Sequence, residues 1–323
     1  MAARAWRLRA LAATLAIVFK RGHWWENDAM DVHILGSINV DTILSVDALP
    51  TAGETVLAAQ VTRLPGGKGA NQAVAAARMG ARVTMTGAVG ADADGDWMRA
   101  VLKGEEVDVR GIATLAGVPT GAAMIAVDAA GENQIIVAPG ANALLAPETA
   151  PKPGLILAQL EIPLDTIASA FAASAGPRLL NAAPFIPAAC ALFAHTDLLI
   201  VNQHELAGYA DVPAISGPAE AIAAARALRA HPQQQIVVTL GGQGAVAVFG
   251  DAAIHAPALS VTPRDTVGAG DCFCGAMAAL IAEEMDLAAV LPLANAAAAL
   301  CTQTVGAIPA MPARAAVMAA LAG

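Results

Sequence analysis

The segment Asp265-Thr-Val-Gly-Ala-Gly-Asp271 carries the strongest chemical signal in the sequence, and an apolar stretch that we expect to be helical follows it. Small residues at a helix start let backbone N–H groups converge on an anion, and the helix dipole adds positive potential there. Asp271 would then accept a proton from an attacking hydroxyl while these amides stabilise a transferring phosphoryl group. Taken alone, the motif favours a simple N-cap role for Asp271. The amides in question belong to Gly268, Ala269 and Gly270.

A second glycine-rich segment is Pro65-Gly-Gly-Lys-Gly-Ala-Asn71. It is not a Walker A loop, because Thr62 stands where that motif needs its first glycine. Its glycines would instead let the backbone approach a small polar molecule, with Lys68 and Asn71 as hydrogen-bond donors. The spacing is equally compatible with a simple turn that leads into a helix.

Two further polar pairs carry weaker signals. Asn39 and Asp41 are two residues apart, so in an extended segment they point to the same face and could grip sugar hydroxyls. Asn202 and Glu205 are three apart and suit a phosphate and its hydrated Mg²⁺, although a capping box at a helix start is the simpler interpretation.

The order of apolar runs predicts the elements that position these residues. From Asp31 onward, short apolar strands alternate with alanine-rich helices, which is typical of an α/β fold with a mostly parallel sheet. Runs at about 40–62 and 121–138 interrupt this rhythm and predict a small antiparallel sheet. Four predicted strands end in polar residues, at the sheet edge where open α/β folds bind ligands. These residues are Gln159, Asn181, Asn202 and Thr239.

Composition limits the classes of function. The formal net charge of −9 over 323 residues argues against a nucleic-acid or membrane surface. Four cysteines without paired spacing indicate reduced thiols in a cytoplasmic protein. Residues 1–29 imitate a signal peptide without a cleavage site, so we interpret them as an extension upstream of a domain over 30–323 that starts at Met30. A Rossmann dehydrogenase is excluded, because no GxGxxG follows the first strand.

Together, the motifs resemble those of the ribokinase (PfkB) family of carbohydrate kinases. Gly36-Ser-Ile-Asn-Val-Asp41, Gly66-Gly-Lys-Gly-Ala-Asn-Gln72, Asn202-Gln-His-Glu205 and Asp265-Thr-Val-Gly-Ala-Gly-Asp271 stand in that family's order from about residue 32 to about residue 312. The second motif is most similar to the ribokinase branch. The resemblance implies a three-layer fold with a β lid, and transfer of phosphate from ATP to the primary 5-hydroxyl of D-ribose.

The resemblance also implies residue roles. Asp271 would be the base, and the sugar would be held by Asn39, Asp41, Gly67, Lys68, Gly69, Ala70, Asn71 and Glu161. ATP and its Mg²⁺ would meet Asn202, Glu205, Thr239, Leu240, Gly241, Gly242, Gln243, Gly244, Gly270 and Asn295. An activating K⁺ would lie near Asp265, Val267, Cys301, Thr304, Gly306 and Ala310. Ala310 replaces a common serine, which weakens the expectation of K⁺ activation.

Other implications concern assembly and substrate. The family pairs its lid with that of a second subunit, so the resemblance implies a homodimer. Deoxyribose, another sugar or a nucleoside remain alternative acceptors, because lid side chains shape the pocket. A rival of another class is a binding protein that keeps the fold but has lost the chemistry.

Overall fold

The computed structural model describes residues 29–147 and 153–322. The predicted extension over 1–29 lies outside these residues except for Ala29. Within the described part of the chain, no helix combines the length and the apolar character that crossing a membrane would require.

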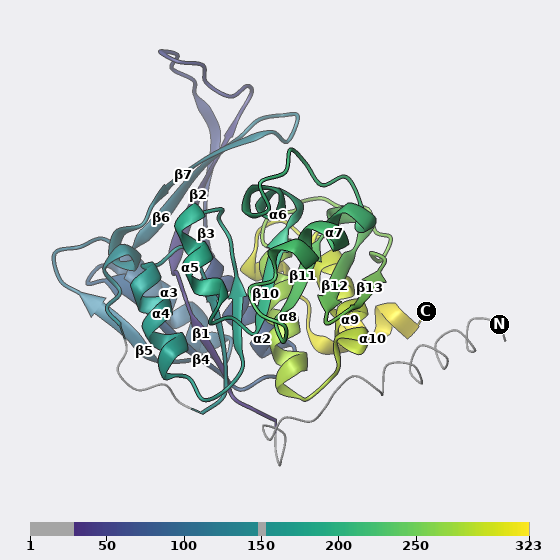
Figure 1. Cartoon of the computed structure of the whole chain (residues 1–323). Coiled ribbons are helices and arrows are strands. Elements are labelled where there is room, and N and C mark those ends of the chain that lie inside the picture. Colours follow the sequence, from purple (N-terminus) through teal and green to yellow (C-terminus); the bar gives the residue numbers. More distant parts are fainter. Residues whose placement is uncertain (1–28, 148–152, 323) are drawn as a thin grey trace.

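A nine-stranded sheet forms the centre of the molecule, in the order β13-β12-β11-β10-β9-β8-β1-β4-β5 (Figure 1). All neighbouring strands are parallel from β11 to β5, whereas β12 is antiparallel to both β11 and β13. The strands are β1 (Val32–Leu35), β4 (Val83–Gly90), β5 (Asp108–Leu115), β8 (Leu155–Gln159), β9 (Arg178–Asn181), β10 (Leu198–Asn202), β11 (Gln235–Thr239), β12 (Ala245–Phe249) and β13 (Ala252–Ala256).

Helices cover both faces of this sheet. Successive residues of a strand point to opposite faces, so Ile34 and Leu35 enter two different buried clusters, as do Leu157 and Ala158. One cluster is closed by α2 (Lys68–Arg78), α3 (Ala93–Gly104), α8 (Ala269–Ala282), α9 (Leu287–Cys301) and α10 (Arg314–Ala322). The other is closed by α4 (Leu164–Ala173), α5 (Cys190–Phe193), α6 (Gln203–Tyr209) and α7 (Pro218–Leu228). The predicted three-layer α/β fold is therefore confirmed.

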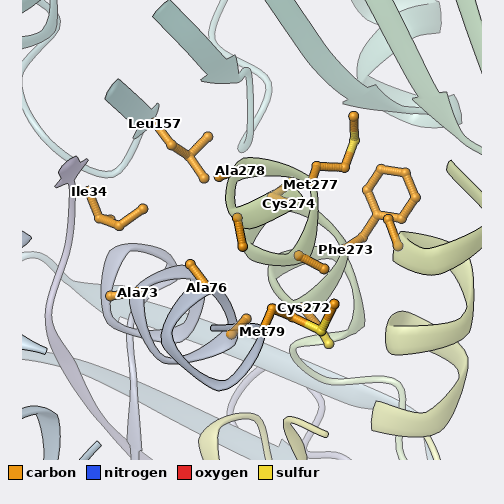
Figure 2. Close-up of a cluster of buried hydrophobic side chains, with 14 of the residues drawn as sticks. Ile34, Ala73, Ala76, Met79, Leu157, Cys272, Phe273, Cys274, Met277 and Ala278 are labelled. Atoms are coloured by element: carbon orange, nitrogen blue, oxygen red, sulfur yellow. The ribbon is translucent and has the colours of Figure 1, made fainter. Parts of the chain in front are cut away.

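Helices α2 and α8 pack against each other at short range. A Cβ atom on Gly275 would lie 2.5 Å from the Gln72 carbonyl oxygen and 2.6 Å from the Ala75 Cβ, so only glycine fits there. Figure 2 shows Met79, at the end of α2, beside Cys272 of α8 in this cluster. The small side chains bring the two helix starts together, and with them the residues that could do chemistry.

A second sheet of four strands forms the lid, in the order β3-β2-β6-β7 (Figure 1). Its strands are β2 (Asn39–Val46), β3 (Ala58–Gly66), β6 (Gly121–Val127) and β7 (Asn133–Ala138). The outer pairings are antiparallel, whereas β2 and β6 pair in parallel. The lid was expected over 40–62 and 121–138, but β3 continues to Gly66, which pairs with Asn39. The lid therefore reaches directly into the glycine-rich segment.

Some boundaries differ from the sequence prediction for identifiable reasons. An alanine-rich helix was expected over 291–302, but α9 begins at Leu287, capped by the Asp286 side chain, which accepts from the Ala289 N–H, and Pro292 lies inside the helix. Strand β5 was not predicted because its half-exposed sequence lacks a continuous apolar run. A strand at a sheet edge can carry polar and small residues, and its sequence then lacks the apolar pattern by which a strand is recognised.

Candidate active site

A cleft opens at the carboxyl edge of the large sheet, where β9, β10 and β11 end. Asn181, Asn202 and Thr239, three of the four predicted strand-end residues, line it. Gln159 does not, because it is fully buried beneath. The remaining lining residues are Lys68, Ala183, Ile200, Val201, Glu205, Gly268, Gly270, Asp271 and Cys274. The cleft therefore joins the glycine-rich segment, the strand ends and the start of α8.

Asp271 is the third residue of α8 and does not cap it. The N-cap is Gly268, whose φ of 76° is left-handed, and no side chain caps this helix. Instead, the Asp271 carboxylate accepts a hydrogen bond of 2.9 Å on each oxygen, from Asn71 Nδ2 and from Gln72 Nε2. The N-cap interpretation, which the motif favoured when taken alone, is wrong because the carboxylate points towards α2.

The start of α8 has the features expected of an anion site. The first intrahelical hydrogen bond runs from the Cys272 N–H to the Gly268 carbonyl, at 2.8 Å. Residues before it have no carbonyl four residues earlier inside the helix, so their N–H groups project from the helix end. The Ala269 N–H turns back to Thr266 O at 3.3 Å. Gly270 faces open space on the cleft side.

The surroundings of Asp271 act on its pKa in both directions. Burial raises it, because desolvation disfavours the charged carboxylate, whereas Lys68 and the amides of Asn71 and Gln72 lower it. The same attraction raises the Lys68 pKa, with Asp271 as the main cause. The lysine therefore stays protonated and faces a basic carboxylate.

The glycine-rich segment packs against the loop that follows β1. A Cβ on Gly67, whose φ is 89°, would lie 2.7 Å from the Asn39 backbone nitrogen, and one on Gly69 would meet Ser37 at the same distance. Ala70 is buried in the core and its N–H donates to the Ser37 carbonyl, so its side chain supports the loop and does not face the cleft. The expected contact between Ala70 and a sugar stays a prediction.

Glu161 connects the loop after β1 to the glycine-rich segment by hydrogen bonds. It accepts from the Ser37 hydroxyl at 2.5 Å and from the Lys68 backbone N–H at 3.2 Å. Its other oxygen lies 3.8 Å from Lys68 Nζ. Glu161 and Lys68, two of the residues expected to hold a sugar, thus form a partly exposed ion pair.

Asn39 and Asn71 each have one polar side-chain atom that could bind a ligand. Asn142, in the 3₁₀ helix Gly140–Leu144, accepts from the Ile38 N–H and donates to Asn39 Oδ1 at 2.8 Å. Asn39 therefore keeps its Nδ2 as the group available to a ligand. Asn71 Oδ1 is buried without a hydrogen-bond partner. Such an orphan acceptor in a polar site suits a hydroxyl donor from a ligand.

Asp41 has an unusual ionisation. Its pKa is raised from 3.8 to about 6, first by burial and then by repulsion from Glu161 and Asp271, with Lys68 opposing. Gly66 makes room for it, because a Cβ there would lie 2.1 Å from an oxygen of the Asp41 carboxylate. Three carboxylates, Asp41, Glu161 and Asp271, thus surround the single ammonium group of Lys68.

On the other side of the cleft, Asn202 and Glu205 form the capping box of α6. Asn202 Oδ1 accepts from the Glu205 N–H and Glu205 Oε2 accepts from the Asn202 N–H, both at 2.8 Å. Burial raises the Glu205 pKa, which disfavours its charge until a cation approaches. The capping interpretation is confirmed, and both residues also line the cleft.

The rest of the expected nucleotide segment follows β11. Leu240 is buried, and the 3₁₀ turn Gly241–Gln243 and Gly244 connect β11 to β12. Gly242 faces open space. Asn295 is buried and its Nδ2 donates to the carbonyls of Ala256 and Pro257, so it fixes the chain after β13.

Asp265 joins the two chain segments that carry the expected cation residues, the loop before α8 and the segment from the end of α9 to the 3₁₀ helix Ile308–Ala310. One Asp265 oxygen accepts from the Val267 N–H at 2.9 Å and the other from the Gly306 N–H at 2.8 Å. Cys301 and Ala310 are buried nearby in the chain, with Thr304 between them. Across the described residues, no group of three or more His, Cys, Asp and Glu side chains could hold a metal ion. A weakly bound cation would rely on backbone carbonyls.

Sequence reasoning gave no role to the buried residues Gln72 and Asn142, and it placed Gln159 and Asn181 only at the ligand-binding edge of the sheet. Gln72, Gln159 and Asn181 form hydrogen bonds behind Asp271, and Asn142 orients Asn39. The position of Gln72, directly after Asn71 in the motif, was a usable signal. Nothing in the sequence around Asn142 pointed to its role.

Comparisons with known proteins agree with this geometry. The model of the pfkB family of carbohydrate kinases matches residues 30–314. A ribokinase of Bacillus subtilis is 37% identical over 294 residues, which cover 88% of this chain and 97% of the relative. A deoxyribokinase of Salmonella typhi is 34% identical over 273 residues, covering 81% and 89%. The structure of Arabidopsis thaliana ribokinase complexed with ribose and ATP matches with a TM-score of 0.79 and 29% identity, covering 91% and 99%.

Proposed function

The chain belongs to the pfkB family of carbohydrate kinases and is a sugar kinase; from this premise we propose that it transfers the γ-phosphoryl group of ATP to the primary 5-hydroxyl of D-ribose. One observation carries the proposal. The buried Asp271 carboxylate, held by two amides, lines one cleft together with Lys68 and Glu205, and we assign Lys68 to the sugar and Glu205 to the phosphates.

The proposed reaction needs a base and a site for developing negative charge. Asp271 takes the proton of the 5-hydroxyl as the oxygen attacks the γ-phosphorus and ADP leaves. The N–H groups of Gly268 and Gly270 stabilise charge on the transferring group, and the Ala269 N–H joins them when it releases the Thr266 carbonyl. Lys68 keeps the base ionised and adds positive charge. Closure of the lid excludes water, which would otherwise compete as acceptor.

The sugar and the cations have residues that fit them. Asn71 Oδ1 lacks a hydrogen-bond partner and would accept a hydrogen bond from a sugar hydroxyl. Asp41, Glu161 and Asn39 Nδ2 would supply the other polar groups around the sugar. Asn202 and Glu205 would hold Mg²⁺ near the phosphates, where the ion neutralises charge when bound. Asp265 and the carbonyls of the two segments that it joins would hold K⁺.

A coupled assay for ADP with saturating Mg·ATP tests the proposal, with D-ribose, 2-deoxyribose, a ketohexose and a nucleoside as acceptors, each with and without K⁺. We expect D-ribose to give the highest kcat/KM. The likeness to a deoxyribokinase makes 2-deoxyribose the second candidate. If kcat/KM is higher for 2-deoxyribose than for D-ribose, 2-deoxyribose replaces D-ribose as the proposed acceptor. Ribose binding without ADP release would replace the kinase proposal by a binding function.

We also propose a homodimer through the lid and a cytoplasmic location, for a domain over 30–323. Strand β7 is exposed along its whole length, and Ile136 is 72% exposed. Apolar side chains on an exposed strand commonly mark an interface. Sedimentation of the wild type against Ile136→Lys tests this, because the charge would shift the dimer to monomer.

A further inference from the structure

Gln72 is fully buried beside Asp271, yet the proposed reaction gives it no role. Its Nε2 donates to Asp271 Oδ1 at 2.9 Å and to Asn181 Oδ1 at 3.0 Å. Its Oε1 accepts from Gln159 Nε2 at 2.7 Å. The amide thus uses both of its N–H groups and its oxygen inside the protein.

These partners permit only one orientation of the Gln72 amide. Turned over, its oxygen would face the Asp271 carboxylate and the Asn181 Oδ1, which are both acceptors, and its N–H groups would face a donor. The Gln159 N–H therefore fixes the side of the amide that meets Asp271. Asn181 is oriented in turn by the bond from its Nδ2 to the Ile200 carbonyl, at 3.3 Å.

The partners also come from rigid parts of the fold. Gln72 lies on α2, Gln159 and Asn181 end the adjacent strands β8 and β9, and Asp271 lies on α8. Helices α2 and α8 pack so closely at Gly275 that their separation is fixed. A side chain held by such elements keeps a defined geometry.

We propose that Gln72 is a positioning residue for phosphoryl transfer, which, with Gln159 and Asn181, holds the Asp271 carboxylate in one orientation towards the sugar hydroxyl. The reaction it serves is the proposed function; the hydrogen-bond arrangement itself does not depend on it. Asn71 holds the other oxygen, so each carboxylate oxygen receives one amide and keeps a lone pair for a proton. Gln72 restricts rotation of the base and favours its ionised form.

The test compares Gln72→Met and Gln159→Met with the control Gln234→Met. Gln234 is also fully buried with its amide bonded, but to the backbone of Phe193, Thr196 and Ala230, away from the cleft. It therefore reproduces the loss of a buried amide without touching the base. Gln159→Met removes little else, because Gln159 Oε1 has no hydrogen-bond partner.

In Gln72→Met, we expect kcat to fall roughly tenfold to a hundredfold, as for loss of a hydrogen bond to a charged group. The acid limb of the kcat profile should move to higher pH, while the KM for ATP stays unchanged. Gln159→Met should give a smaller change in the same direction. Gln234→Met should lower the free energy of unfolding and leave kcat and its pH profile unchanged.

A readout without substrate separates this proposal from the kinase proposal. Carbon-13 NMR of labelled aspartate side chains, assigned with Asp271→Asn, follows the Asp271 titration in the free protein. Its midpoint should rise in Gln72→Met and stay in place in Gln234→Met. If the wild type phosphorylates no sugar, the proposed function fails and the NMR result still decides this one. If Gln72→Met has the same Asp271 titration midpoint and the same kcat as the control Gln234→Met, the positioning role is overturned. If Gln72→Met does not fold, Gln159→Met decides by the same readouts.

Discussion

Asp41→Asn should make the ligand-free protein more stable at neutral pH, although we propose that the Asp41 carboxylate binds the sugar. The Asp41 pKa of about 6 lies above its ordinary value of 3.8, mainly because the carboxylate is desolvated and faces other carboxylates. The folded state therefore holds this proton more tightly than the unfolded chain. For an acid with a raised pKa, stability is present at low pH and is lost as the pH rises from 3.8 through 6.

The magnitude follows from the two pKa values. Their difference, about 6 minus 3.8, multiplied by about 1.36 kcal/mol per pKa unit, gives about 3 kcal/mol of lost stability above pH 7. At pH 5 the loss is about half of that, because Asp41 is then mostly protonated in the folded state. Asparagine carries no charge and avoids the loss. We expect Asp41→Asn to raise the free energy of unfolding at pH 7.5 by up to about 3 kcal/mol.

Urea unfolding of the wild type and Asp41→Asn at pH 5.0 and pH 7.5 measures this difference. The gain should be about twice as large at the higher pH, and the urea dependence of the free energy should be equal in both proteins. Calorimetry with ribose should show weaker binding by the variant. An equal gain at both pH values, or a loss of stability at pH 7.5, would refute the assignment of a raised pKa to Asp41.

Three other substitutions test the rest of the site. Asp271→Asn should lower kcat by about a hundredfold or more with ATP affinity unchanged by calorimetry, and near-normal turnover would remove it as the base. Gly268→Ala should cost roughly 1–3 kcal/mol in urea unfolding, because φ is 76° and the new Cβ would lie 2.6 Å from the Ala307 Cβ; an unchanged midpoint would contradict this strain. Lys68→Met removes the cation that lowers the Asp271 pKa, so the acid limb of kcat should move to higher pH, and a shift to lower pH would reverse the argument.

Continuous apolar runs in the sequence predicted the buried central strands, whereas strand ends that depend on pairing with distant residues were not predicted. The strand that was expected to end at Gln159 is β8, Leu155–Gln159, and its continuous apolar run is buried along its length, as in a central strand of a parallel sheet. The lid strand β3 was misplaced, because its exposed residues carry no such run and its end depends on pairing with Asn39.

The site divides in the same way. Gly67 and Gly268 could be recognised from sequence, because their positive φ angles require glycine and both stand in compact motifs. The hydrogen bond from Gln72 to Asp271 joins residues 199 positions apart, and no local spacing indicates it. Whether Asp271 caps its helix or faces α2 depends on the close packing at Gly275, which only the folded structure reveals.

The charges of the site explain why its binding and catalytic groups are linked. Asp41, Glu161 and Asp271 repel one another around a single ammonium group, Lys68. Burial, and after it repulsion from Glu161, raises the pKa of Asp271, so its carboxylate holds a proton more readily. Burial and then repulsion from Glu161 and Asp271 disfavour the ionised form of Asp41 in the same way. A neutral sugar whose hydroxyls donate to these carboxylates relieves the cost without neutralising the base. The instability of the empty site and the basicity of Asp271 therefore have one physical origin.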